Sequence, residues 1–450
     1  MRLRFILEAD WPPLAWHAAW QWGGECVVRH GAQVEVWEDR FFEGVWDGDF
    51  AEAGFDSAEH PCGSGAVIRG DEVLLVPPFH PQERIYVSEE RQEASNSLHC
   101  FLSVTGATLH PEVPSYREHF LDALKDGAAR ALPELPLAGG RTVALLELWP
   151  WRCTPLGGER VKPQPSSPAF DGFEAYSGAM RAGMRRLVDN ASDPRRRARF
   201  EPKTELSTGF DSVAVGVWAR EVGVRQALCT VGREDARAVG AQLGFDLRVK
   251  ELREVEHLPL SVRLEFYLLP EGKNQPMALH ETDQRGALIF SGHGGDEMWS
   301  MTSAFEGPEC ARPRDTIIAG VSYSEYRLRV GFVLVPVPLM NQTNHAAIEA
   351  ISRASELMPF RDEDPNYCRP IPRRVGVEGG VRWRDFGQKK HKGQIQFVAQ
   401  TPASIEAAIR TFAADLGPCE GPLDYAMHWA FATAANPYLP RERGVISPLK

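Results

Sequence analysis

The chain has 450 residues, of which 43% are hydrophobic and 25% are charged, and its formal net charge is −11. This length predicts two or three domains. The composition excludes a chain that is disordered throughout. The absence of a long apolar run excludes a membrane span and a secretory signal. The acidic balance argues against a general nucleic-acid binder, and eight cysteines without a CxxC pair indicate reduced thiols in a cytoplasmic protein without a structural zinc site.

The first third of the chain predicts short strands separated by turns. Runs rich in Val, Ile and aromatic residues are bounded by Gly, Pro and Asp, which is typical of β structure. The predicted strands cover residues 33–37, 66–68, 73–76, 84–87 and 142–146. One helix is expected over residues 116–130, and residues 150–171 are a linker by composition. We therefore expect a strand-rich α+β domain over residues 1–170.

The pattern changes after the linker. Apolar residues of 173–188 recur at helical spacing, and the RRRAR run at 195–199 is expected in a solvated loop, with binding of a polyanion or a peptide as the other interpretation. Predicted strands then alternate with predicted helices, which indicates a parallel sheet flanked by helices, with ligands at the carboxyl ends of its strands. The strands cover 204–206, 226–231, 247–249 and 287–290, and the helices cover 212–222 and 234–243, the latter capped by Gly244. Residues 171–450 are thus expected to form an α/β domain.

One motif, STGFDS at residues 207–212, lies between a predicted strand and a predicted helix. Backbone N–H groups in such a turn attract anions together with the helix dipole, and Gly209 lets the backbone approach a phosphate closely. Asp211 would repel a phosphate, so its presence predicts a bridging divalent cation. An ordinary turn that caps a helix explains this string equally well.

A second motif, SGHGGDE at residues 291–297, follows the apolar strand ALIF. Its three glycines and two acids make a loop that can close around a ligand, and Asp296 is placed to hold a metal ion. A glycine-rich surface turn is the alternative. Two turns that each follow a strand and each carry an Asp favour a shared site over coincidence.

Together the two motifs resemble those of the asparagine synthetase family of ATP pyrophosphatases, in which SGGxDS binds pyrophosphate and a later SGxGxDE loop supplies a second metal-binding acid. The resemblance covers about residues 173 to 400, and Thr208 stands where the family usually has Gly. It implies an adenine nucleotide α-hydrolase-like fold for residues 171–450, with ATP and Mg²⁺ as cofactors and Asp211 and Asp296 as metal ligands. The ATP-binding residues that it implies, including one on the strand that faces the adenosine, are Ser207, Thr208, Gly209, Asp211, Ser212, Val231, Gly292 and Gly294.

The N-terminal residues indicate whether the chain could take nitrogen from glutamine. Glutamine-dependent asparagine synthetases carry a nucleophilic Cys directly after the initiator Met, whereas this chain begins MRLR and its first cysteine is Cys26. An internal cysteine has no free α-amino group to act as its base. We therefore expect residues 1–170 to be a degenerate, Ntn-hydrolase-like glutaminase domain without that activity. This combination resembles β-lactam synthetases and lasso-peptide cyclases.

The resemblance implies an ATP-dependent, AMP-forming amide-bond ligase or cyclase that adenylates a carboxylate and couples it to an amine without glutamine hydrolysis. The substrate would be a small molecule or peptide that carries these groups, with a precursor peptide or a protease as candidate partners and no membrane partner. One alternative is an ATP pyrophosphatase that modifies a nucleobase or tRNA, which the acidic charge disfavours. Another is a non-catalytic nucleotide-binding regulator, against which the presence of Asp211 and Asp296 argues.

Two further sets of catalytic candidates follow from the same resemblance. The segment RDFGQKK at 384–390 is similar to a basic R-x-K-x-G-F segment of the family, which implies that Lys389 or Lys390 contacts the phosphates; a solvated basic loop is the alternative. β-lactam synthetases pair a Tyr at the third position of the second loop with a later Glu as general base. His293 holds that position here and Glu325 is its partner by spacing, unless His293 only contacts substrate and Glu325 is structural.

Overall fold

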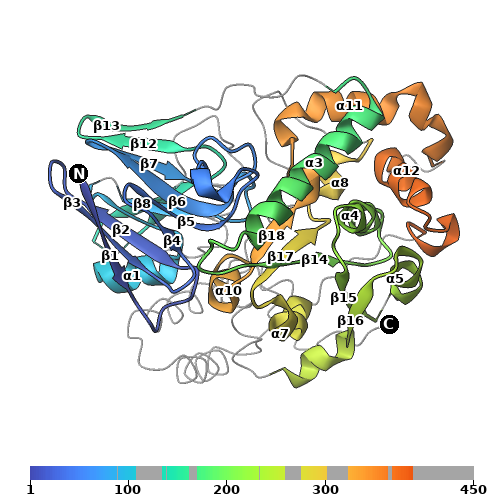
Figure 1. Ribbon diagram of the computed structural model, residues 1–450, viewed down its shortest axis with the longest axis horizontal. Helices are drawn as coiled ribbons and strands as arrows, with labels where there is room; N and C mark the ends of the chain where they lie inside the picture. The colour runs from blue at the N-terminus through green and yellow to red at the C-terminus, as the bar shows by residue number, and fades with distance from the viewer. Residues whose placement is uncertain are drawn as a thin grey trace.

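The computed structural model describes residues 1–88, 90–107, 134–137, 139–161, 170–232, 234–258, 275–301, 323–362 and 367–388. Three sheets organise these residues, two in the N-terminal part of the chain and one, surrounded by helices, in the C-terminal part (Figure 1). None of the helices within these ranges is long and apolar enough to cross a membrane. The helix that we expected over residues 116–130 lies outside the described residues.

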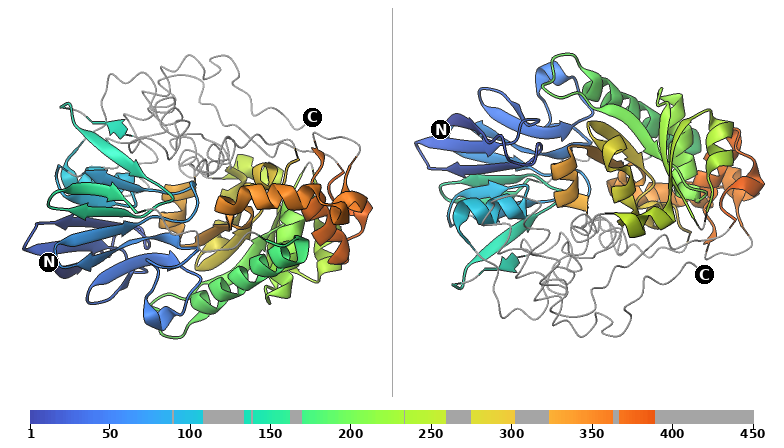
Figure 2. Two further views of the ribbon diagram at one scale, coloured as in Figure 1. Left: turned by 90° about the horizontal axis from the view of Figure 1, so that it is seen from above. Right: turned by 90° about the horizontal axis from the view of Figure 1, so that it is seen from below.

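The two N-terminal sheets pack face to face, as Figure 2 shows, with Trp16, Phe41 and Leu75 in the core between them. All the neighbouring strands are antiparallel except β1 and β3, which run parallel. One sheet has the order β1 (Arg2–Leu7), β3 (Glu25–His30), β2 (Trp16–Trp20), β9 (Glu93–Ser95), β8 (Ile85–Ser88), β11 (Thr142–Leu146) and β10 (Glu134–Pro136). The other has the order β13 (Gly157–Arg160), β12 (Trp151–Thr154), β7 (Glu72–Val76), β6 (Cys62–Arg69), β5 (Arg40–Val45) and β4 (Glu35–Val36).

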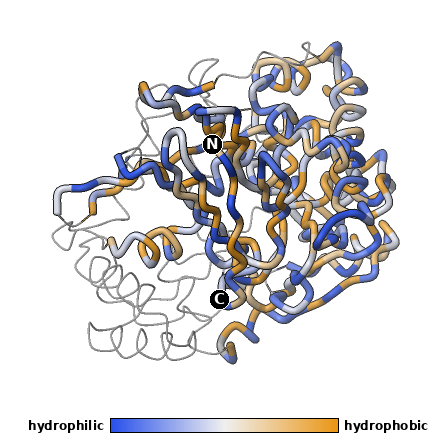
Figure 3. The backbone as a smooth tube through the Cα atoms, turned by 60° about the vertical axis from the view of Figure 1, so that its left-hand side comes forward, coloured by the Kyte–Doolittle hydropathy of each residue, from blue (hydrophilic) through white to orange (hydrophobic). Residues whose placement is uncertain are grey.

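Alternation of buried and accessible side chains explains why these segments are strands. In β3 every second residue is buried, which is what a strand with one face on a core requires. The mixed colours along the strands near the N label in Figure 3 follow the same rule. Helix α1 (Leu98–Thr105) begins where the Ser97 side chain accepts a hydrogen bond from Cys100 N–H, 3.1 Å away.

The linker prediction is wrong for residues 151–160. These residues form the hairpin of β12 and β13, and Trp151–Cys153 pair with residues of β7. The Thr154 hydroxyl accepts from Leu156 N–H and donates to the Gly157 carbonyl, so the Pro and Gly residues close a turn here. Composition alone does not separate a linker from a tight turn, because both use the same residues. Residues 162–169 lie outside the described residues.

The third sheet contains five parallel strands, as the alternation of predicted strands and helices led us to expect. Their order is β16 (Asp246–Glu251), β15 (Gln226–Val231), β14 (Glu201–Glu205), β17 (Ala287–Ser291) and β18 (Val333–Pro336). In β17, Leu288 and Phe290 face one apolar core and Ala287 and Ile289 face another, so both faces of the sheet are covered. The described region is therefore of mixed α/β class, with a β-rich N-terminal part.

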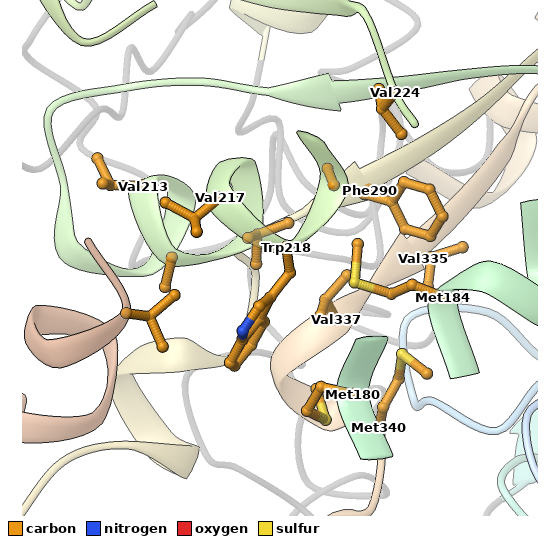
Figure 4. Close-up of a cluster of buried hydrophobic side chains, with 14 of the residues drawn as sticks. Met180, Met184, Val213, Val217, Trp218, Val224, Phe290, Val335, Val337 and Met340 are labelled. Atoms are coloured by element: carbon orange, nitrogen blue, oxygen red, sulfur yellow. The ribbon is translucent and has the colours of Figure 1, made fainter. Parts of the chain in front are cut away.

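Helices cover both faces of this sheet. Figure 4 shows one covered face, where side chains of α3 and α4 meet those of the strands; the labelled residues include Met184, Trp218, Phe290 and Val335. The α-helices are α3 (Phe173–Ser192), α4 (Phe210–Glu221), α5 (Arg237–Leu243), α7 (Glu281–Gln284), α8 (Gly295–Met298), α10 (Tyr323–Val330), α11 (His345–Arg353) and α12 (Pro370–Glu378). The short 3-10 helices are η1 (Phe50–Glu52), η2 (Leu252–His257), η3 (Gln275–His280), η4 (Val337–Leu339), η5 (Gln342–Asn344), η6 (Ser355–Phe360) and η8 (Trp383–Asp385).

The path of the chain through the sheet creates a switch point between β14 and β17. The chain first moves outward from β14 through β15 to β16, and it then returns to the other side of β14 to form β17 and β18. In parallel sheets of this kind, the loops on either side of such a reversal separate at the carboxyl ends of the strands and leave room for a ligand. Both sequence motifs follow the two strands that flank this switch point.

The RRRAR run lies in a loop, as expected, and Arg195, Arg197 and Arg199 are exposed, whereas Arg196 is buried against the N-terminal sandwich. The Arg196 side chain is fully buried, donates to the Gly44 carbonyl and to Asn190 Oδ1, and lies 3.8 Å from the Glu35 carboxylate. Glu35 also accepts from Arg197 N–H at 3.0 Å. The sequence shows a run of cations but not the acid that another part of the chain supplies to it.

A second buried contact joins α10 to the sandwich. The Arg327 guanidinium lies 2.8 Å from the nearest Glu43 oxygen and 2.6 Å from Glu83, and all three side chains are at most 5% exposed. Burial raises the pKa of the Glu83 carboxyl, and the positive charge of Arg327 opposes that rise. This cluster ties the edge of the parallel sheet to the sandwich, because α10 leads directly into β18.

Candidate functional site

The two motifs meet at the switch point. Strand β14 pairs with β17 in the register Thr204 to Phe290, so the first loop (residues 207–212) and the second loop (residues 291–297) begin on neighbouring strands. A Cβ atom on Gly292 would lie 2.7 Å from Ser212 N, and one on Gly295 would lie 2.2 Å from Asp211 Cγ. Glycine is therefore required at both positions, because the loops touch there. Gly292 was among the predicted site residues, whereas Gly295 was identified only as part of the glycine-rich loop.

Hydroxyl groups hold the first loop in shape. The Ser207 and Ser212 Oγ atoms are 2.7 Å apart, Ser207 N–H donates to Ser212 Oγ, and Gly209 N–H donates to Ser207 Oγ. Gly209 is the residue before α4, and Asp211 lies in the first turn of that helix. The loop therefore presents a helix N-terminus and its own backbone at the switch point, which is the arrangement that binds anions in other sheets of this type.

Thr208 has a specific partner. Its N–H and its hydroxyl both donate to Glu234 Oε2, at 3.1 Å and 2.6 Å, and its carbonyl accepts from Gly387 N–H at 2.8 Å. Thr208 therefore links the first loop to the turn after β15 by two hydrogen bonds. A glycine at this position could form only the one from its backbone N–H. Glu234 was not among the predicted site residues, although an acid three residues after an apolar strand is a signal that could have identified it.

The second loop positions Asp296 at the switch point. Asp296 Oδ1 accepts from Arg369 Nη2 at 2.9 Å; the Asp296 side chain is 45% exposed, whereas that of Arg369 is buried. Burial, followed by the charges of Asp211 and Asp296, raises the pKa of Tyr367 to about 12. Both carboxylates thus act on one hydroxyl group. Arg369 and Tyr367 were not among the predicted site residues.

The residues at this site fit a divalent cation. Asp211 and Asp296 offer carboxylate oxygens, the ligand type that Mg²⁺ prefers. The charges of Asp211, Asp296 and Glu234 all raise the pKa of Tyr367, while Arg369 lowers it. Asp211, Asp296 and Glu234 thus supply three carboxylates around Tyr367, of which Asp296 is paired with Arg369.

His293 lies near a carboxylate, but that carboxylate is not Glu325. Its Nδ1 is 2.5 Å from Ser291 Oγ and 3.8 Å from Glu205 Oε2. The two oxygens of Glu325 instead accept from Ser97 Oγ and from Leu98 N–H at the start of α1, each at 2.8 Å. Spacing in the sequence suggested Glu325, but its α10 helix faces the sandwich. Glu205, the last residue of β14, is the acid that sequence reasoning missed.

Four predicted residues remain. Gly294 is the residue before α8 and has the left-handed conformation that favours glycine. Val231 is the buried last residue of β15, so it lies at the same edge of the sheet as the two loops. In the RDFGQKK segment, Phe386 packs edge-on against Phe210 and Gly387 binds Thr208, which brings the segment to the first loop. Lys389 and Lys390 lie outside the described residues, so their contact with phosphate stays a prediction.

Comparison with known proteins adds no family to this picture. No protein-family model matches the sequence, and a search of curated proteins gave no match either. A functional assignment therefore rests on the motifs and on the geometry that brings them together.

Proposed function

We propose that the protein is an ATP-dependent, AMP-forming ligase that adenylates a substrate carboxylate and couples it to an amine without glutamine hydrolysis. One observation carries this proposal: two acid-bearing loops converge at the switch point of a parallel sheet, with Gly292 and Gly295 packed against Asp211 and Ser212. In this proposal, residues 171–450 are an adenine nucleotide α-hydrolase-like synthetase domain, and the N-terminal sandwich is a degenerate glutaminase domain.

The first loop would hold the phosphates of ATP at the N-terminus of α4, and its Thr208 N–H could join them by exchanging Glu234 for a phosphate oxygen. Asp211 and Asp296 would hold Mg²⁺, which neutralises phosphate charge when it is bound. Arg369, buried beside Asp296, would add a fixed positive charge. An oxygen of the substrate carboxylate would form a bond to the α-phosphorus as the bond to pyrophosphate breaks, and pyrophosphate would leave with the electron pair. The acyl-AMP then contains a good leaving group that the carboxylate itself lacks.

The cysteines support a reaction without a thiol nucleophile. All six cysteines in the described ranges are buried. Burial raises the pKa of Cys26 to about 12 and raises that of Cys62 as well. A thiolate is the reactive form of cysteine, so these side chains are poorly suited to attack glutamine. The nitrogen would come from an amine on the substrate or on a second small molecule or peptide.

The test is exchange of labelled pyrophosphate into ATP, measured with Mg²⁺ and a panel of amino acids, dicarboxylates and peptides. We expect exchange with at least one carboxylate, and a loss of about 100-fold in Asp296→Asn, as for removal of other groups that stabilise charge in a transition state. Asp246→Asn on β16, whose carboxylate pairs with the exposed Arg248, is the matched control. Absence of exchange with every carboxylate would contradict the proposal, and exchange that depends on RNA would favour a nucleic-acid-modifying enzyme.

A further inference from the structure

The switch point contains a chain of three polar side chains that the adenylation step does not use. Glu205 ends β14, Ser291 ends the neighbouring β17, and His293 follows in the second loop. Ser291 Oγ lies 2.6 Å from Glu205 Oε2 and 2.5 Å from His293 Nδ1. We infer that Glu205 and Ser291 are positioning residues: they hold His293, the general-base candidate that the resemblance already implies, in the tautomer that places its lone pair on Nε2.

The direction of each hydrogen bond follows from the number of protons available. An ionised carboxylate only accepts, so the single hydroxyl proton of Ser291 goes to Glu205. Ser291 Oγ must then accept from its other partners, which are His293 Nδ1 and, at 3.3 Å, the backbone N–H of His293. A neutral imidazole has one N–H. That proton therefore lies on Nδ1, and Nε2 carries the lone pair that can take a proton.

The cost of this arrangement argues against a purely structural role. Ser291 is 1% exposed, and Glu205 Oε1 is buried without a hydrogen-bond partner among the described residues. Burial of a carboxylate oxygen without a hydrogen bond is unfavourable for folding. A carboxylate that keeps one oxygen buried at this cost, while its side chain and that of the neighbouring histidine remain 19% and 21% exposed, is typical of a functional site.

The position suits the second half of the proposed reaction, on which this inference rests. Glu205 is two residues from the first loop, and His293 lies in the second loop, whose Gly292 and Gly295 pack against Asp211 and Ser212. The nitrogen lone pair of a neutral amine would form the new C–N bond, and the C–O bond to AMP would break with its electron pair on the phosphate oxygen. The surplus proton of the nitrogen would pass to His293 Nε2. Glu205 and Ser291 are positioning residues in this scheme.

The first test needs no substrate. Nitrogen-15 NMR of histidine-labelled protein distinguishes a protonated ring nitrogen from one with a lone pair, and His293→Gln assigns the signals. We expect protonated Nδ1 in the wild-type protein and in Ser291→Thr, which keeps the hydroxyl, and a shift toward protonated Nε2 in Ser291→Ala and Glu205→Leu. Glu281→Gln, which removes a partly exposed acid paired with Arg329, is the control and should change nothing. Protonated Nε2 in the neutral wild-type ring would overturn the inference.

The second test separates the two half-reactions. With a carboxylate that supports exchange, hydroxylamine should trap acyl-AMP in His293→Gln at the wild-type rate, because it is a neutral nucleophile at pH 7. Coupling to an alkylamine should fall by about 100-fold, which is a typical contribution of general base catalysis. Equal rates of alkylamine coupling in the two proteins would exclude His293 as the base. If the wild-type protein shows no exchange, the ligase proposal fails, whereas the NMR result still decides the tautomer.

Discussion

Glu234 accepts two hydrogen bonds from Thr208, one from the backbone N–H at 3.1 Å and one from the hydroxyl at 2.6 Å. A phosphate bound by the first loop would use N–H groups of the same turn. In the proposed function, the Glu234 carboxylate and a nucleotide would therefore compete for this loop. Removal of the charge in Glu234→Gln should lower the Kd of a non-hydrolysable ATP analogue by about 5-fold, since one charge a few Å away contributes about 1 kcal/mol in a solvated site. Isothermal titration calorimetry in MgCl₂ measures this.

Asp235→Asn is the matched control for that experiment, because Asp235 is the next residue, is half-exposed and pairs with Arg237. Its effect on the Kd should be small. Weaker binding of the analogue by Glu234→Gln would show that Glu234 supports the nucleotide instead of competing with it.

Gly295→Ala tests the contact between the two loops. The new methyl group would lie 2.2 Å from Asp211 Cγ, so one loop must move. We expect a loss of roughly 1 to 3 kcal/mol in the free energy of unfolding, as for other overpacked sites, together with loss of pyrophosphate exchange. Urea denaturation and the exchange assay measure the two effects.

Gly178→Ala provides the control, because Gly178 lies inside α3 and has open space around its Cα. Alanine there should stabilise the helix by roughly 0.5 to 1 kcal/mol and leave exchange unchanged. A Gly295→Ala protein with wild-type stability and activity would mean that the loops do not touch as described.

Arg327→Met should be among the most destabilising substitutions in the chain. It leaves Glu43 and Glu83 buried without their cation, and loss of one partner from a buried ion pair costs about 3 to 5 kcal/mol. The loss should shrink as the pH falls from 7.5 toward 5, because protonation removes the buried negative charge. Arg329→Met in the same helix, which breaks a more exposed pair with Glu281, should cost much less. Urea denaturation across this pH range checks both.

Acid should destabilise the protein through buried histidines. Burial, with the nearby charge of Arg29, lowers the pKa of His17 to about 4, and burial lowers that of His280 to about 4. The unfolded chain binds protons at these positions near pH 6.5, so their contribution is present above pH 6.5 and is lost as the pH falls toward 4. His280→Gln should flatten the plot of unfolding free energy against pH in that window. Glu83, whose pKa is raised, has the opposite sign: its contribution is lost as the pH rises above about 4.5.

The parallel sheet was predictable because its strands have a local signal. Residues 226–231 form a strand as predicted. The strand predicted over residues 287–290 is also present and is one residue longer, because it ends at Ser291. Apolar runs between turns and helices are sufficient for such segments, and Gly244 ends α5 in the left-handed conformation as expected. The two loops were found because each follows such a strand.

The partners of the site residues could not be predicted, because each pair is distant in the sequence. Glu205 meets Ser291 only because β14 and β17 are neighbours, and Arg369 reaches Asp296 from the chain before α12. Glu325 illustrates the reverse case, since its spacing from the second loop suggested His293 while its helix faces α1. Local pattern identifies an element, whereas the order of strands decides which side chains meet.

Helix α10 links the N-terminal sandwich to the parallel sheet through buried polar contacts. Glu325 caps α1 and Arg327 neutralises two acids of the sandwich, so the sandwich completes the charge balance of a helix that belongs to the parallel sheet. Removal of the sandwich would take these partners from Glu325 and Arg327 and expose buried charge next to β18, so the parallel sheet depends on the sandwich for the stability of one of its own helices.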